Sequence, residues 1–65
     1  MSTATCTSTN IEVFRLFEEY EMTKISENII SVMSDTDVEW FIPLYDEDTY
    51  EVTDANGNKA VFVID

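Results

Sequence analysis

The apolar residues that follow position 11 recur at helical spacing. One face of the predicted helix carries Val13, Leu16, Phe17 and Tyr20. Thr9 and Glu12 have the spacing of a capping box, with Asn10 as the competing N-cap. The apolar residues between 22 and 33 fall about 160° away from this stripe, so one straight helix cannot bury both. The pattern therefore predicts a helix over 11–21 and a second short element over 25–33.

The second element has two interpretations. Ile25, Ile29 and Met33 keep the i, i+4 spacing of a helix. Residues 28–32, in contrast, have the β-branched content of a strand. Helix is the preferred interpretation.

Residues 38–45 alternate with the period of a half-buried strand. The inward positions are predicted to be Val38, Trp40, Ile42 and Leu44. Pro43 cannot donate to a ladder, which predicts an edge position or a bulge. Residues 46–49 predict a hairpin connection to the next strand.

The dipeptide Asn56-Gly57 is the strongest turn signal in the chain, because a type I′ turn needs positive φ at both positions. A two-residue turn there pairs Asp54 with Lys59, Val52 with Val61 and Tyr50 with Val63. The predicted architecture is α+β, with one or two N-terminal helices packed on a three-stranded antiparallel β-meander. Residues 1–9 are expected to be a flexible Ser/Thr-rich arm, and residues 10–65 a single small α+β domain.

The charge of the chain adds a strong negative electrostatic field to this predicted fold. The chain of 65 residues has 14 Asp and Glu against three Lys and Arg, a net charge of −11. Such a field repels nucleic acid and anionic membrane and attracts basic surfaces. The partner is therefore expected to be a basic protein, and whether the chain is a monomer or a homodimer stays open. The alternative is that the acidity serves only solubility or adaptation to high salt.

Catalytic and metal chemistry are not predicted. The chain has no His, and its one cysteine, Cys6, has no basic neighbour to activate it. The acidic runs at 35–39 and 46–48 offer oxygen ligands, but neither has the spacing of an EF-hand loop. We expect no enzyme activity, no metal and no cofactor. The N-terminal sequence lacks a signal peptide, which predicts a cytoplasmic location.

The candidate site is the outward row of the predicted acidic strand and the turn that follows it. An extended strand separates alternate residues by about 6.6 Å, so outward acids form a row of charge, as phosphates do on duplex DNA. Outward aromatic residues would add apolar anchors. The alternative is a solvated edge whose acids prevent aggregation. The row and turn comprise Asp35, Asp37, Glu39, Phe41, Tyr45, Asp46, Glu47 and Asp48, and the predicted partner-binding set also includes Glu51 and Glu27.

Three short strings resemble a known class of inhibitors. Residues 25–29, 45–49 and 60–64 (ISENI, YDEDT and AVFVI) are similar to the DNA-mimicking strand, acidic hairpin and apolar strand of uracil-DNA glycosylase inhibitors. These belong with anti-restriction and anti-CRISPR proteins to the phage inhibitors that imitate DNA. The resemblance implies that Glu27 would enter the DNA cleft of the target enzyme, and that Ile29 and Met33 would help to trap an apolar finger of that enzyme. In that case the protein acts in the host cytoplasm.

The leading hypothesis is a non-enzymatic acidic inhibitor that binds the basic nucleic-acid-binding surface of a host defence or repair enzyme by DNA mimicry. The alternative is a small regulatory, adaptor or antitoxin-like module that pairs with a basic protein without mimicking DNA. Competition by added duplex separates the two hypotheses.

Overall fold

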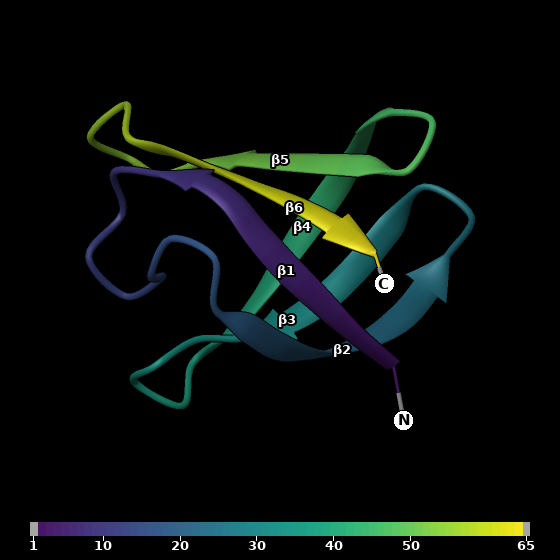
Figure 1. Cartoon of the computed structure of the whole chain (residues 1–65). Coiled ribbons are helices and arrows are strands. Elements are labelled where there is room, and N and C mark those ends of the chain that lie inside the picture. Colours follow the sequence, from purple (N-terminus) through teal and green to yellow (C-terminus); the bar gives the residue numbers. More distant parts are fainter. Residues whose placement is uncertain (1, 65) are drawn as a thin grey trace.

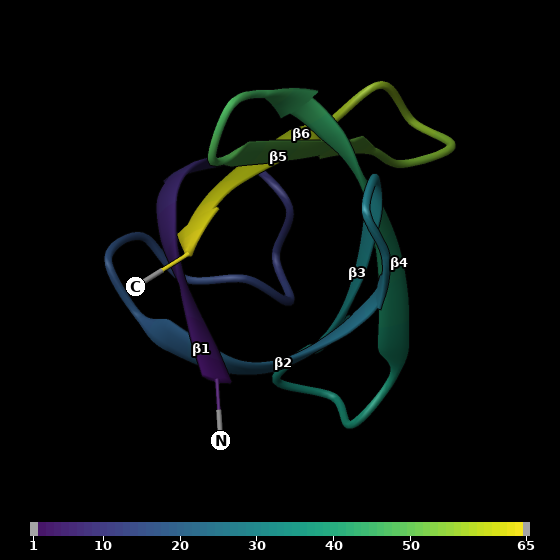
Figure 2. The same ribbon diagram turned by 90° about the vertical axis from the view of Figure 1, so that its right-hand side faces the viewer.

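The computed structural model describes residues 2–64, which form a closed barrel of six antiparallel strands (Figures 1 and 2). Each strand pairs with the next in sequence, and the last pairs with the first. The described residues contain no helix, and so none long and apolar enough to cross a membrane. The strands are β1 Ser2–Thr9, β2 Glu19–Ser26, β3 Ile29–Met33, β4 Glu39–Asp46, β5 Thr49–Thr53 and β6 Lys59–Ile64.

The predicted α+β fold is wrong, because the two segments expected to be helices form a loop and two strands. Residues 11–18 are a loop, and β2 buries Tyr20 and Met22 while the intervening Glu21 is exposed. Burial in β2 therefore alternates with a period of two. Leu16 and Phe17 precede this strand, and together with Tyr20 they give the sequence an apolar spacing typical of a helix. Leu16 and Phe17 are exposed in the structure. The strand pairing that closes the barrel therefore overrides the local helical pattern.

Residues 25–33 follow the strand interpretation that the β-branched content favoured. They contain the end of β2, a tight turn and β3. Within β3, Ile30 and Val32 are fully buried, whereas Ile29 and Met33 are exposed. Residues four apart in the sequence lie on the same face of a strand as well as of a helix. The i, i+4 spacing of Ile29 and Met33 is thus compatible with both.

The Ser/Thr-rich residues expected to form an arm are strand β1. This strand pairs with β2 on one side and with β6 on the other, so it closes the barrel. Its inward side chains, Ala4 and Cys6, are small and fully buried. β-Branched threonine favours extended backbone, and small residues suit the crowded interior of a small barrel. Met1 and Asp65 lie outside the described residues.

Strands β2 to β6 repeat with a period of 20 residues, since β2, β4 and β6 begin at residues 19, 39 and 59, and β3 and β5 begin at 29 and 49. The extra residue of a bulge is Ile25 in β2 and Tyr45 in β4, because the register shifts between residues 24 and 26 and again between 44 and 46. The loops at 34–38 and 54–58 have the same form, and each has left-handed backbone at its fourth residue, Asp37 with φ 61° and Gly57 with φ 85°. The barrel is therefore assembled from similar strand–loop–strand units.

The predicted hairpin at Asn56-Gly57 exists, but its predicted register is wrong. Thr53, not Asp54, pairs with Lys59, and the ladder continues with Tyr50 opposite Phe62. The backbone N–H of Asp54 donates to the carbonyl of Asn58 at 2.8 Å, which leaves a three-residue loop. Such a loop places a residue with positive φ at its end, and Gly57 occupies that position.

The alternation predicted for β4 is confirmed in its inward members. Ile42 is fully buried, and Trp40 and Leu44 pack against the core. Val38 is the exception, because it lies in the loop before β4 and is 54% exposed. Pro43 lies inside a paired strand opposite Ile29, next to the bulge at Tyr45. The closed barrel leaves no edge for it to occupy.

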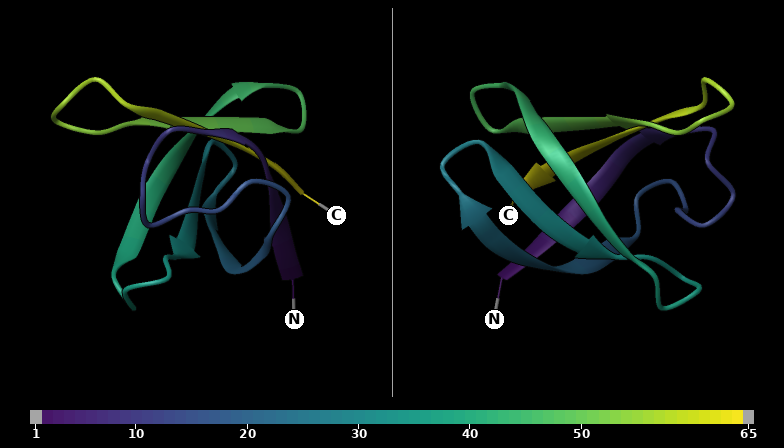
Figure 3. Two further views of the ribbon diagram at one scale, coloured as in Figure 1. Left: turned by 60° about the vertical axis from the view of Figure 1, so that its left-hand side comes forward. Right: turned by 180° about the vertical axis from the view of Figure 1, so that it is seen from behind.

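One end of the barrel is closed by the loop between β1 and β2. This loop lies with the β3–β4 and β5–β6 loops at that end, while the two tight turns and both chain ends lie at the other (Figure 3). It carries Phe14 into the interior, where the side chain is 2% exposed. The Phe14 ring makes edge-to-face contacts with Phe62, Trp40 and Tyr20, with centroids 4.8, 5.2 and 5.4 Å apart.

Replacement of Phe14 by Ala is expected to destabilise the fold by about 3–5 kcal/mol, because it empties the centre of this aromatic cluster. A domain of this size has little more stability than that, so much of the variant should unfold. Urea unfolding followed by tryptophan fluorescence measures the change. Phe14→Leu gives a milder loss, and Leu16→Ala, an exposed site on the same loop, should change stability by no more than about 0.5 kcal/mol. Equal effects of Phe14→Ala and Leu16→Ala would contradict the structure.

Candidate functional site

The structure places three of the five residues of the predicted outward row on strand β4. Glu39, Phe41 and Tyr45 are exposed on β4, and the last two are 59% and 70% exposed. They face outward because the intervening Trp40, Ile42 and Leu44 pack inward. Asp35 and Asp37 lie in the loop that precedes this strand.

The acidic turn after β4 lies at the opposite end of the barrel. Asp46, Glu47 and Asp48 are all exposed there, and the Asp46 carboxylate accepts the backbone N–H of Glu47 at 2.9 Å. Glu27, in the tight turn between β2 and β3, lies at this same end. The structure thus brings Glu27 together with the acidic turn but separates both from Asp35 and Asp37. Strand β4, which carries the row, connects these two ends of the barrel.

Few of these acids are neutralised. Within residues 2–64 the ion pairs are Arg15 with Asp35 at 3.5 Å and Lys59 with Glu51 at 3.7 Å. Both pairs are solvent-accessible and contribute little stability. Glu51 is half-buried on β5, beside β4, so it is the predicted site residue least available to a partner. The other acids of the row keep their charge facing solvent.

The position of Asp35 is fixed by a chain of hydrogen bonds. The Tyr20 hydroxyl donates to the Asp35 carboxylate at 3.2 Å and accepts the backbone N–H of Arg15 at 2.7 Å. The Asp35 backbone N–H donates to the carbonyl of Val13 at 3.1 Å. The loop that plugs the barrel and the loop that begins the acidic row are therefore held together.

Glu39 is also held in place. The Ser31 hydroxyl donates to the Glu39 carboxylate at 2.5 Å. Ser31 faces outward, since Ile30 and Val32 are inward, yet it is only 4% exposed because its neighbours on the outer face cover it. The carboxylate of Glu39 consequently leans from β4 across β3.

Sequence reasoning did not place Ile29 and Met33 beside this row, although the resemblance to glycosylase inhibitors implied an apolar contact for both. Ile29 and Met33 are 38% and 41% exposed on β3. Phe41 pairs with Ser31, so Ile29 and Met33 occupy the two diagonal positions next to it. The helical interpretation of 25–33 hid this arrangement. The signal that could have found it is the β-branched content of residues 28–32, which favours a strand.

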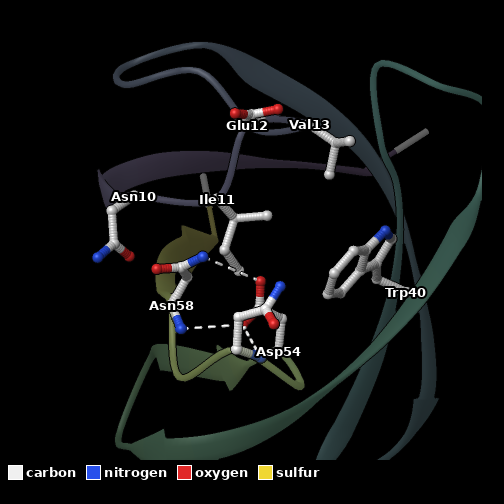
Figure 4. A pocket seen from close by; sticks show the side chains of 8 residues that line it. Asn10, Ile11, Glu12, Val13, Trp40, Asp54 and Asn58 are labelled. Atoms are coloured by element: carbon white, nitrogen blue, oxygen red, sulfur yellow. Dashed lines mark hydrogen bonds between the residues drawn. The ribbon is translucent and has the colours of Figure 1, made fainter.

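A pocket of about 370 Å³ lies at the plugged end of the barrel, between Trp40 and the β5–β6 loop (Figure 4). Several of its polar groups are hydrogen-bonded within the surrounding loops, whereas the buried indole N–H of Trp40 has no hydrogen-bond partner among residues 2–64. The Asp54 carboxylate accepts the backbone N–H groups of Asn56 and Asn58, both at 2.8 Å, and the Asn10 amide oxygen accepts the backbone N–H of Lys59 at 2.7 Å. These contacts hold two loops in place, and we interpret the pocket as a structural junction.

No three His, Cys, Asp or Glu side chains in the described part of the chain are grouped so that they could hold a metal ion. Comparison of the chain with protein-family models, curated proteins and solved structures gives no match. The resemblance to DNA-mimicking inhibitors therefore rests on the three short strings alone.

The hydrogen-bonded Tyr20 predicts a loss of stability at alkaline pH. Burial raises the pKa of Tyr20 above its ordinary value of 10.0, and burial likewise raises the pKa of Cys6 above 9.0. Both groups keep their proton in the folded chain at a pH at which the unfolded chain loses it. Their contribution is fully present below these ordinary values, and the free energy of unfolding falls as pH rises above them.

Tyr20→Phe is expected to lower stability by about 1–2 kcal/mol at neutral pH, because the Arg15 N–H loses its acceptor. It should also make the alkaline loss smaller, leaving the part due to Cys6. Urea unfolding of both proteins at neutral pH and above pH 10 measures this difference. An alkaline loss of the same size in both proteins would show that Tyr20 is not its source.

Proposed function

We propose that the protein is a non-enzymatic inhibitor that occupies the basic nucleic-acid-binding surface of a host defence or repair enzyme. The observation that supports this is the exposed row along β4. It joins the acidic loop at 35–37 to the acidic turn at 46–48 and is almost free of ion pairs. Among the described residues, Asp37 at one end of the row and Asp46, Glu47 and Asp48 at the other form no ion pair, so the field of the row attracts a basic surface.

The spacing of the charges supports mimicry of a duplex at two points. Duplex DNA carries about one negative charge per 1.7 Å of its axis, far more densely than a strand can. The protein instead concentrates carboxylates in the loop at one end of β4 and in the turn at its other end. A basic groove that binds phosphates at both of its ends would meet acids at both ends of this row.

The fold also favours binding because it restricts the movement of the charged side chains. Asp35 and Glu39 are fixed by Tyr20 and Ser31. Side chains that are ordered before binding lose less conformational entropy when the complex forms. A rigid barrel is therefore a better scaffold for mimicry than a flexible acidic chain of equal charge.

The proposal is tested by capture and displacement. The immobilised protein should retain a nucleic-acid-binding enzyme from host lysate at low salt, and added duplex DNA should displace that enzyme. Its activity on DNA should fall when the protein is added in solution. Retention that duplex DNA cannot displace would contradict mimicry and favour the adaptor function.

Charge-neutral variants then locate the site. Asp46→Asn, Glu47→Gln and Asp48→Asn together should weaken binding to the captured enzyme about tenfold or more, which is about 1.4 kcal/mol. The matched control removes the same number of charges from the exposed residues Glu12, Glu18 and Glu19, which lie off the row, by replacing each with Gln. Calorimetry should show less than about a threefold change for this control. Equal losses in both variants would mean that net charge alone is recognised.

A further inference from the structure

The outer face of strands β2, β3 and β4 exposes an apolar patch that acidity does not explain. Proteins rarely display neighbouring apolar side chains to water unless these form an interaction site. We define the apolar patch as Ile25, Ile29, Met33, Phe41, Pro43 and Tyr45. Each of these residues is exposed, and Ile25 and Tyr45, the extra residues of the two bulges, are 53% and 70% exposed.

The strand register shows that the patch is continuous. Ile29 pairs with Pro43, and Phe41 lies between the diagonal positions of Ile29 and Met33. Tyr45 follows Pro43 by two positions on the same strand. Ile25 precedes Ser26, the residue that pairs with Ile29. All six side chains therefore lie on three adjacent strands, with Phe41 near the centre.

Acidic residues surround the patch. Glu39 pairs with Met33 across the ladder, Glu27 lies in the turn between Ile25 and Ile29, and Asp46 follows Tyr45. Lys24 is the one basic residue in these three strands. Two copies of the chain, each with a net charge of −11, would bring like charges together around this face. The charge pattern therefore fits a cationic partner better than a second copy.

The dimensions of the patch fit one helix. The six steps from Glu39 to Tyr45 span about 20 Å at about 3.3 Å per residue, and three strands are about 10 Å wide. An α-helix of about 13 residues is about 20 Å long and about 10 Å across. Helix on sheet is a common way to bury one apolar face against another.

We propose that this face is the docking site for a cationic amphipathic helix of the target. The apolar stripe of the helix would cover Phe41 and its neighbours, while Lys and Arg on its flanks would meet Glu39, Glu27 and Asp46. This inference rests on the proposed function, because it names the element of the basic target that the protein binds. The apolar contact with the helix is not screened by salt, and it adds to the electrostatic attraction, which salt weakens.

A synthetic peptide tests this docking without any enzyme. The probe is a peptide of about 18 residues of Leu and Lys with the Leu residues on one helical face, and its control has the same composition in scrambled order. The striped peptide should bind, become helical by circular dichroism, and shift the backbone amide NMR signals of residues 29–33 and 39–45. The scrambled peptide should bind at least about tenfold more weakly.

Matched protein variants separate the apolar contact from charge. Phe41→Ser should weaken binding of the striped peptide about tenfold and leave its salt dependence unchanged, because no charge is removed. Leu16→Ser, an exposed apolar site outside the patch, should change binding less than about twofold. Neutral replacement of Asp46, Glu47 and Asp48 should instead reduce the salt dependence.

Three results would overturn the docking proposal. They are equal binding of the two peptides, amide shifts confined to other faces, or no binding of the striped peptide. Self-association through the patch, seen by sedimentation and abolished by Phe41→Ser, would assign the face to a second copy instead. None of these results affects displacement of the captured enzyme by duplex DNA, so failure of the docking proposal is distinguishable from failure of the proposed function.

Discussion

The structure depends on the packing of Phe14 inside the barrel. The β1–β2 loop, which carries Phe14, closes one end of the barrel. Ala4, Cys6 and Ala60 are too small to fill the interior, although all three are fully buried. Phe14 supplies that volume and contacts rings from β2, β4 and β6. In so small a domain, a side chain that touches half of the strands contributes a large share of the burial that stabilises the fold.

This packing also determines where the charges lie. The loop that carries Phe14 places the backbone N–H of Arg15 on Tyr20, and Tyr20 in turn positions Asp35. The first acid of the β4 row is thus connected to the centre of the core. Closure of the barrel pairs every strand on both sides, so the acids are not needed to protect an exposed sheet edge. Their concentration along β4 therefore needs an explanation other than edge protection.

The sequence predicted the second half of the chain better than the first. Trp40, Ile42 and Leu44 show a period of two that no helical pattern matches, and the outward placement of Phe41 and Tyr45 followed from it. The turn at Asn56-Gly57 was located correctly, but its register depended on whether one or two residues take positive φ. Only Gly57 does, and this shifts every pair in the hairpin by one residue.

The first half was mispredicted because its decisive contacts are distant in sequence. Cys6 is buried by pairing with Phe62, and Asn10 binds the backbone of Lys59. The local spacing of apolar residues gives no information about either contact. By chance, that spacing places four residues on one face of a helix, namely Val13, Leu16, Phe17 and Tyr20. The apolar patch was hidden for the same reason, since it forms only when β3 lies beside β4.

The coexistence of this patch with a net charge of −11 is itself informative. An apolar face on a small neutral barrel would promote association of the barrel with itself. The acids around the patch oppose that association through like-charge repulsion, and they attract a cationic surface by the same field. A single arrangement of residues thus disfavours association of the chain with itself and would favour the cationic partner that we propose. Acidity that served solubility alone would need no exposed Phe41 at the centre of the acidic face.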